Sequence, residues 1–398
     1  MSASSINFNA AAVLKEYVPA FENALKPIHQ ANGLPNACYR DPEVLQAESD
    51  VIFKQGWAGL AHVADVPNKN DVKVRDFLGM PLIVVRDGND NIRVFHNVCR
   101  HRGMILIPND TNTRVLRCRY HSWTYGLDGS LRQAPHVGGH GETEHPDFDA
   151  SCAGLREVRS AIMFGTVFIN LSGDAEPFED FIKPVSDRWA NFVNVDMFAQ
   201  TSDCYFSLDV ACNWKLAVEN YCEAYHLPFV HPELNKNSRL EDHYNIEEAT
   251  YAGQGSLDYN NPEGTDGRTF PNAKNLDKFW GKGAEYLSVF PNVLLGAHKD
   301  HFFSIVLEPI TGMQTREHIQ LYYFDKEVEG EDYAEMRAEV RRFWNTVFKE
   351  DVFAVESMQD GRRSPGYDGG VFSPVMDGPT VTFHRWMAGK LLAGAAAG

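Results

Sequence analysis

Two pairs of cysteine and histidine carry the clearest chemistry in this sequence. The first pair is Cys99 and His101, and the second pair, Cys118 and His121, begins after sixteen intervening residues. Two thiolates and two imidazoles can hold a zinc ion. They can equally hold a [2Fe–2S] cluster in which the cysteines bind one iron and the histidines bind the other. Loop-like sequence flanks each pair, so both pairs are expected on loops.

The flanking residues favour the iron–sulfur cluster over zinc. Zinc modules rarely place Cys before His within each pair on two β-loops. Arg102-Gly103 and the run 122–126 also suit a close backbone approach and polar donors to sulfide. Both segments, 99–103 and 118–125, resemble the two cluster-binding loops of the Rieske family. The resemblance implies a Rieske [2Fe–2S] cluster bound by Cys99, His101, Cys118 and His121.

A second group of candidate ligands lies near residue 226. His226 and His231 are five positions apart, which is about 140° of rotation on an ideal helix, so they would not share a face. Pro228 lies between them and should distort or end a helix there, which could turn both imidazoles inward. Glu223 is three residues before His226 and shares a helical face with it. Two histidines and one carboxylate would form the facial triad of non-haem Fe(II) oxygenases.

The carboxylate of such a triad is expected from a long helix predicted over 332–359. Its apolar residues include Val347 and Val355, and Asp351 lies four residues from each of them, on the same buried face. An ionised carboxylate there needs a compensating cation. A structural salt bridge and a metal explain this spacing equally well. Glu350 and Glu356 are the nearby competitors, and Glu350 is expected to be the more exposed.

Over nearly the whole chain, the order of these motifs resembles the catalytic α subunit of the Rieske non-haem iron oxygenases. The resemblance is carried by the Rieske loops, the run 219–231 and the late run 350–359. It implies an α+β protein with a small all-β Rieske domain and a helix-grip catalytic domain, in which a curved antiparallel sheet wraps around a long helix. It also implies that a mononuclear Fe(II) is bound by His226, His231 and Asp351.

Glu223 matches the bridging carboxylate of that family, which links a Rieske histidine, here His121 of a neighbouring subunit, to His226. Ring-dihydroxylating members usually carry Asp at this place. Glu in a Glu-x-Tyr-His setting resembles more closely the branch that oxidises quaternary ammonium compounds, such as the glycine betaine and carnitine oxygenases. Electron transfer between subunits predicts a cyclic homo-oligomer, and a trimer is the family norm.

The resemblance therefore predicts a terminal oxygenase that uses O₂ to hydroxylate a C–H bond. An N-methyl group of a quaternary ammonium or N-methylated small molecule is the expected target, and its hydroxylation leads to demethylation. An aromatic-ring hydroxylase is the alternative. A Rieske electron carrier is a more distant one, because a carrier needs only the first domain. Five aromatic residues could form a cation–π cage, although a place in a sheet explains any one of them more simply: Phe290, Phe302, Phe303, Tyr322 and Tyr323.

Composition and the absence of certain motifs limit the classes of partner that this chain is expected to have. The chain of 398 residues has 37 basic and 54 acidic residues, a net charge of −17, which argues against nucleic acid or an anionic membrane as a partner. Seven scattered cysteines are not a disulfide framework. With neither a signal peptide nor a membrane span, a soluble cytoplasmic protein is expected. Since no G-x-G-x-x-G or flavin motif occurs, a separate flavin and iron–sulfur reductase should oxidise NAD(P)H.

The expected elements divide the chain into three parts. Residues 1–57 form an N-terminal helical segment that packs on the catalytic domain, 58–170 form the Rieske domain, and 171–398 form the catalytic domain. The turn-rich strands of the Rieske domain include turns at 87–90 and 125–130. In the catalytic domain we expect helices over 214–230 and 332–359, a long loop over 235–285, an antiparallel meander over 286–324 and a strand over 381–386.

Overall fold

The computed structural model describes residues 8–199, 202–260 and 268–397. The chain forms two compact units. Gly59–Gly173 forms the smaller unit, and Met1–Ala58 with Asp174–Gly398 forms the larger one. Helices and sheets are both prominent, which confirms the predicted α+β class. Among the described residues, no helix has the length and apolar character needed to cross a membrane.

The smaller unit is built from two sheets. One has seven strands in the order β1-β10-β9-β4-β3-β2-β5, and the other has three strands in the order β6-β7-β8. The strands are β1 (Ala58–His62), β2 (Asp71–Phe77), β3 (Met80–Arg86), β4 (Ile92–His96), β5 (Thr111–Asn112), β6 (Leu116–Arg117), β7 (Thr124–Tyr125), β8 (Leu131–Gln133), β9 (Glu157–Met163) and β10 (Thr166–Asn170). The loops before β5 and around β6 and β7 carry the two Cys/His pairs.

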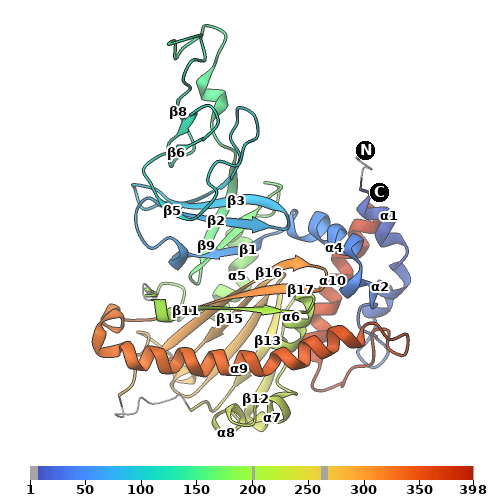
Figure 1. Ribbon diagram of the computed structural model, residues 1–398. Helices are drawn as coiled ribbons and strands as arrows, with labels where there is room; N and C mark the ends of the chain where they lie inside the picture. Colours follow the sequence, from blue (N-terminus) through green and yellow to red (C-terminus); the bar gives the residue numbers. More distant parts are fainter. Residues whose placement is uncertain (1–7, 200–201, 261–267, 398) are drawn as a thin grey trace. The chain divides into compact units, whose positions relative to one another are not determined.

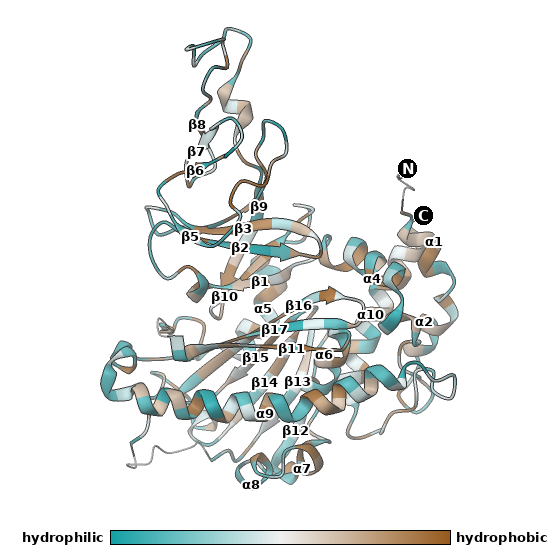
Figure 2. Ribbon diagram, in the orientation of Figure 1, coloured by the Kyte–Doolittle hydropathy of each residue, from teal (hydrophilic) through white to brown (hydrophobic). Residues whose placement is uncertain are grey.

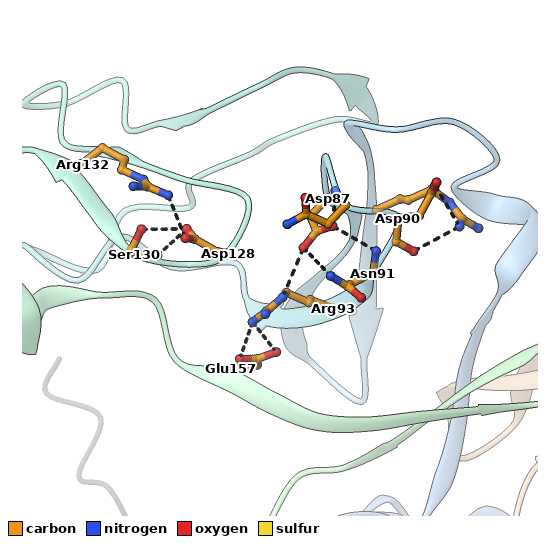
Figure 3. Close-up of polar contacts among 10 residues, drawn as sticks. Asp87, Asp90, Asn91, Arg93, Asp128, Ser130, Arg132 and Glu157 are labelled. Carbon is orange, nitrogen blue, oxygen red and sulfur yellow. Dashed lines mark hydrogen bonds and ion pairs between the residues drawn. The ribbon is translucent and has the colours of Figure 1, made fainter.

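Aspartate side chains close two turns of this unit, as Figure 3 shows. Asp87 Oδ1 accepts backbone N–H bonds from Asn89 and Asn91 at 2.8 and 2.9 Å, between β3 and β4. Asp128 Oδ1 accepts the N–H of Ser130 at 3.1 Å, between β7 and β8. Such Asx turns replace missing ladder hydrogen bonds where the chain reverses. Both lie where the sequence predicts turns.

The larger unit is organised around a curled seven-stranded antiparallel sheet, in the order β11-β17-β16-β15-β14-β13-β12. The strands are β11 (Tyr205–Val210), β12 (His243–Glu247), β13 (Tyr251–Ser256), β14 (Ala284–Val289), β15 (Val293–Ala297), β16 (His301–Thr311) and β17 (Gln314–Tyr323). The predicted meander corresponds to the hairpin succession β14 to β17. The helix α9 (Ala334–Gly361) lies across this sheet (Figure 1).

Helix α9 is held on the sheet by an apolar stripe. Trp344, Val347 and Phe348 are buried, and the ring centroid of Trp344 lies 4.7 Å from that of Phe303 on β16. Figure 2 shows hydrophilic and hydrophobic residues alternating along α9, as one buried and one wet face require. The same periodicity turns Asp351 towards the sheet side, where its side chain is 18% exposed.

The N-terminal helices belong to the larger unit and pack with the C-terminal helix α10 (Gly378–Ala396). They are α1 (Ala10–Lys15), α2 (Val18–Ala24), α3 (Ala37–Arg40) and α4 (Pro42–Glu48), and the remaining helices of the unit are α5 (Phe178–Arg188), α6 (Trp214–Cys222), α7 (Leu227–Val230) and α8 (Leu234–Asn237). Asp41 caps α4 by accepting the N–H of Glu43 at 2.8 Å, with Pro42 in the first turn. A π-helical turn, Ser49–Phe53, continues α4.

The predicted helix over 214–230 is in fact two helices. The helix α6 ends at Cys222, and Glu223 is extended, with φ −124° and ψ 160°. Pro228 lies in the first turn of the new helix α7, where its missing N–H is harmless. The break therefore comes before His226, five residues earlier than the proline. Glu223 and His226 meet across this break and not along one helical face.

Two other predictions were wrong. The region 235–285 was expected to be a loop but contains β12 and β13. Gly253 and Gly255 lower the strand propensity of β13, yet a side chain at Gly253 would collide with the Tyr286 carbonyl. The segment 381–386 was expected to be a strand but lies within α10. That helix is buried on nearly every side, so it lacks the amphipathic period that identifies surface helices.

Candidate metal centres and the cavity beside them

The two Cys/His loops of the smaller unit have the same backbone geometry. The N–H groups of Cys99 and Cys118 donate to the carbonyls five residues later, of Met104 and Trp123, both at 2.8 Å. The residue after each histidine-containing turn, Gly103 or Ser122, returns a hydrogen bond to the cysteine carbonyl at 3.0 or 3.1 Å. Both have positive φ, +74° and +60°. The repeat places one thiol and one imidazole in each loop.

The side chains in these loops fit a [2Fe–2S] cluster. Cys99 and Cys118 are 2% exposed, whereas His101 is exposed and His121 is half-buried. The two imidazole rings lie 4.6 Å apart between centroids. A cluster held here would therefore have its cysteine side in the core and its histidine side near solvent, the arrangement that electron exchange requires. We propose, as the sequence does, that these four residues are its ligands.

Tyr125 is an additional residue of this centre. Its hydroxyl oxygen accepts the N–H of Arg100 at 3.1 Å and lies 3.3 Å from the sulfur of Cys99. Because the hydroxyl oxygen is already an acceptor, its proton is free to point at the sulfur. Hydrogen bonds to cluster sulfurs are one determinant of the reduction potential. The sequence placed Tyr125 in the second loop without assigning it this role.

The second candidate centre brings together His226, His231 and Asp351. One ligand atom from each lies within 4.8 Å of the others. Asp351 Oδ1 is 2.9 Å from His231 Nε2 and 3.6 Å from His226 Nε2. Asp351 comes from α9, and the histidines flank the short helix α7. The break at Glu223, rather than the proline, is what turns both imidazoles to the same point.

Each histidine of this centre also has a carboxylate on its other nitrogen. Glu223 Oε1 lies 2.6 Å from His226 Nδ1, and Glu350 Oε2 lies 2.8 Å from His231 Nδ1. Metal-binding histidines commonly donate their second N–H to a carboxylate, which fixes the ring and leaves Nε2 for the metal. Glu350 thus lies behind a candidate ligand. Glu356 is directed away, since it accepts the N–H of Ala211 at 2.9 Å.

The charge at this centre fits a divalent cation. Among the described residues, no Lys or Arg pairs with Glu223, Glu350 or Asp351. Burial lowers the pKa of His231, but Asp351 and Glu350 outweigh it, so the pKa is raised overall. Three carboxylates around two imidazoles, with no cationic side chain among them, are costly to bury without a bound cation. The donor set of nitrogen and oxygen suits ferrous iron.

A cavity opens directly beside these residues, lined partly by His226, His231 and Asp351. Aromatic side chains make up much of its wall: Tyr221, Tyr286, Phe303, Trp344 and Phe348. The polar members are Asn220, Ser238, His243 and Gln254. His243 is bonded to Ser238 at 2.8 Å and Gln254 at 2.5 Å, and burial lowers its pKa. The cavity therefore combines an apolar, electron-rich wall with a few orienting groups.

Only one of the five aromatic residues considered from the sequence lines this cavity. Phe303 does, whereas the other four are buried elsewhere in the sheet and its flanks. Sequence reasoning did not select Trp344 for the cavity, although it lies seven residues before Asp351 and so shares its face of α9. Tyr221 and Tyr286 come from other segments and carry no comparable signal.

Family profiles match both units. Residues 56–146 match the Rieske [2Fe–2S] domain, and residues 199–393 match the catalytic domain of the ring-hydroxylating α subunit. The first of these domains binds a [2Fe–2S] cluster, and the second, in this family, binds a mononuclear iron. These matches confirm the cofactors predicted from the resemblance and the assignment to the oxidoreductases.

Curated relatives cover most of the chain. The carnitine monooxygenase oxygenase subunit of Acinetobacter pittii is 25% identical over 341 residues, 84% of this chain and 86% of the relative. The glycine betaine monooxygenase oxygenase subunit of Pseudomonas aeruginosa is 26% identical over 395 residues, 90% of this chain and 89% of the relative. Both relatives are named as the oxygenase subunits of monooxygenases.

Solved structures share the fold. The quaternary ammonium Rieske monooxygenase CntA with L-carnitine has a TM-score of 0.73 at 23% identity, covering 93% of this chain and 98% of that one. Naphthalene 1,2-dioxygenase from Rhodococcus sp. with indole also has a TM-score of 0.73, at 19% identity, covering 96% and 98%. The two domain matches, which together cover most of the chain, show that it belongs to the Rieske non-haem iron oxygenases, as a catalytic α subunit.

Proposed function

We propose that this chain is the terminal oxygenase of a multicomponent system and hydroxylates an N-methyl group of a small quaternary ammonium compound. The observation that carries the proposal is the aromatic cavity that opens onto His226, His231 and Asp351. Faces of Trp and Tyr attract quaternary ammonium groups through cation–π interactions. The relatives named for carnitine and glycine betaine support the same substrate class.

Different residues would bind the iron, bind the cluster and position the substrate. His226, His231 and Asp351 would hold the mononuclear iron, and Cys99, His101, Cys118 and His121 would hold the [2Fe–2S] cluster. The bound iron supplies O₂ binding, and the cluster supplies single electrons. The aromatic wall excludes water and positions the methyl group. Hydroxylation consumes O₂, two electrons and two protons and releases water, and the hydroxymethyl ammonium product then loses formaldehyde and a proton to leave a tertiary amine.

Glu223 is the proposed bridge between subunits. One carboxylate oxygen lies against His226 Nδ1, and the other accepts the backbone N–H groups of Tyr225 and His226. These contacts fix the carboxylate, and its side chain remains 14% exposed. We propose that the partner subunit's His121 approaches it from outside, so that the working assembly is a cyclic homotrimer. Electrons would enter from a separate NAD(P)H-dependent reductase.

Oxygen uptake with a reductase supplied in trans tests the substrate class. Betaines, carnitine and choline should stimulate uptake and release formaldehyde in proportion to the O₂ consumed, and aromatic acids should not. Ring diols without formaldehyde would replace the proposal with ring hydroxylation, for which the aromatic wall is also suited. Iron content separates both from an electron carrier, because an oxygenase holds three irons per chain and a carrier holds two.

A further inference from the structure

A buried hydrogen-bonded chain ends on the wall of the cavity. The indole N–H of Trp344 donates to His301 Nε2 at 2.9 Å, and His301 Nδ1 lies 2.8 Å from Asp300 Oδ1. All three residues are at most 3% exposed. An indole N–H can only donate, so Nε2 of His301 is the acceptor and its proton is on Nδ1, directed at Asp300. The carboxylate is thus connected to the indole through one imidazole.

The hydrogen-bonded series of Asp300, His301 and Trp344 is separate from both candidate metal centres. Asp300 ends the turn between β15 and β16, His301 is the first residue of β16, and Trp344 belongs to α9. None of the three is a candidate metal ligand, and only Trp344 lines the cavity. Its ring stacks on Phe348, with centroids 5.6 Å apart and planes 22° apart. The turn therefore fixes the indole from behind while the sheet and α9 hold it from the sides.

A second histidine, His298, lies against His301 and adds no positive charge near the wall. The ring of His298 stacks on that of His301, with centroids 4.2 Å apart and planes 8° apart. His298 is fully buried, and neither of its ring nitrogens has a hydrogen-bond partner in the described part of the chain. Burial, and then His301, hold its pKa well below the ordinary value. A neutral His298 adds no repulsion towards a cation in the cavity.

We propose that the chain Asp300–His301–Trp344 makes the indole the main recognition surface for a cationic ammonium group, so that the cavity selects charge as well as shape. Donation of the indole N–H towards an imidazole that itself donates to a carboxylate increases electron density on the indole. Hydrogen-bonded groups in a low-dielectric interior polarise one another in this way. The attraction of a Trp face for a cation is electrostatic and grows with that density. The inference rests on the proposed function, because it needs a cationic substrate in this cavity.

The test compares a cation with its uncharged isostere. Choline and 3,3-dimethylbutan-1-ol have nearly the same shape but differ in charge. Binding of each is measured by calorimetry on the assembled protein with both metal centres loaded and no reductant, so no turnover occurs. Asp300→Asn keeps an acceptor for His301 and removes the charge. Choline affinity should fall about three- to tenfold while the affinity of the neutral alcohol stays unchanged. An equal loss for both ligands would reduce Asp300 to a structural role and overturn the proposal.

A double-mutant cycle tests the connection through the indole. Trp344→Phe keeps an aromatic ring but removes the N–H donor. In this background Asp300→Asn should cause no further loss of choline affinity, because the link is already broken. Additive losses would mean that the carboxylate acts through space, which contradicts the proposed connection through His301 to the indole. Glu308→Gln is the matched control, since Glu308 pairs with His318 at 2.7 Å and neither lines the cavity. It should change neither affinity.

Failure of the proposed Asp300–His301–Trp344 connection (the relay) and failure of the proposed function give different results. If the unmodified protein prefers choline to the alcohol and Asp300→Asn retains that preference, the relay is wrong and the substrate class stands. If the unmodified protein binds both equally, the cationic substrate class itself is wrong. Thermal unfolding and iron content should match those of the unmodified protein in every variant that enters the comparison.

Discussion

His231 Nδ1 lies 2.8 Å from Glu350 Oε2, while its Nε2 lies 2.9 Å from Oδ1 of the very next residue, Asp351. Two consecutive carboxylates of α9 therefore hold the two ends of one imidazole. From the sequence, Glu350 was a competitor for the metal. The geometry instead gives it the position behind a candidate ligand, where it fixes the orientation and tautomer of the ring.

Removal of the Glu350 carboxylate should weaken iron binding without abolishing the site. Glu350→Ala should lower the iron affinity about 10- to 100-fold, as is usual for such outer partners. Glu350→Gln keeps an acceptor and should lose much less. Chelator competition on protein depleted of mononuclear iron measures both. Unaltered iron affinity in Glu350→Ala would exclude this role, provided that the visible absorption of the cluster is intact.

Asp351→Ala should lose the mononuclear iron and retain the [2Fe–2S] cluster. The control is Glu356→Gln, because Glu356 bonds the backbone of Ala211 and should be irrelevant to metal. Iron quantitation should then fall from three to two per chain in the first variant only. If the Glu356 variant loses iron instead, the ligand assignment on α9 is wrong.

Glu223→Gln should retain both metal centres and lose most steady-state turnover, since its carboxylate would no longer connect His226 to a neighbouring subunit. Glu233→Gln is the control, because Glu233 lies nearby on the surface and pairs with Lys236. Stopped-flow measurement of cluster reoxidation after reduction locates the defect. Reoxidation at the rate of the unmodified protein would contradict the bridge.

The buried ion pair Lys215–Glu48 should matter for stability rather than for activity. Lys215 Nζ lies 2.7 and 2.9 Å from the two Glu48 oxygens, and both side chains are 0% exposed. Lys215→Met leaves the Glu48 carboxyl buried without its partner and should cost about 3–5 kcal/mol of unfolding free energy. The double variant with Glu48→Gln should recover most of this loss in denaturant unfolding. An equal or larger loss in the double variant would show that packing, not charge, dominates.

Glu317 should make the metal-depleted protein less stable as pH rises. Glu317 and Asp351 line a second, small cavity. Burial, and then Asp351, raise its pKa from 4.5 to about 8. Between these values the folded state keeps a proton that the unfolded state releases, so stability falls as pH increases from about 4.5 to about 8.

Replacement of Glu317 by Gln should remove that pH dependence. Denaturation midpoints of the metal-depleted protein at pH 5 and pH 8 should differ less in Glu317→Gln than in the unmodified protein. Loading of the mononuclear site should reduce the difference in the unmodified protein too, because a cation neutralises Asp351. An identical pH dependence in both proteins would mean that Glu317 is ionised in the folded state.

Local sequence patterns were sufficient to predict candidate site residues that lie close together in the sequence or on one helical face. Cys99, His101, Cys118 and His121 could be proposed as ligands because each loop carries one cysteine and one histidine close together in the sequence. Asp351 could be placed on the buried face of α9 because helical periodicity is a local property. Prediction failed where the sequence carries no such pattern. The helix α10 has no polar face and so no amphipathic period, and the glycines of β13 lower its strand propensity.

The types and spacing of the proposed ligands, and with them the family and the oxygenase class, follow from the sequence alone, since each motif other than the carboxylate on α9 is contiguous. Only the tertiary structure decided that Glu350 lies behind His231, that the chain breaks at Glu223, and that Asp300 and His301 reach Trp344. The physical reason is that the contacts of Glu350 and of Trp344 join segments 119 and 43 residues apart. Their geometry is set by how α9 packs on the sheet, and no local propensity encodes that packing.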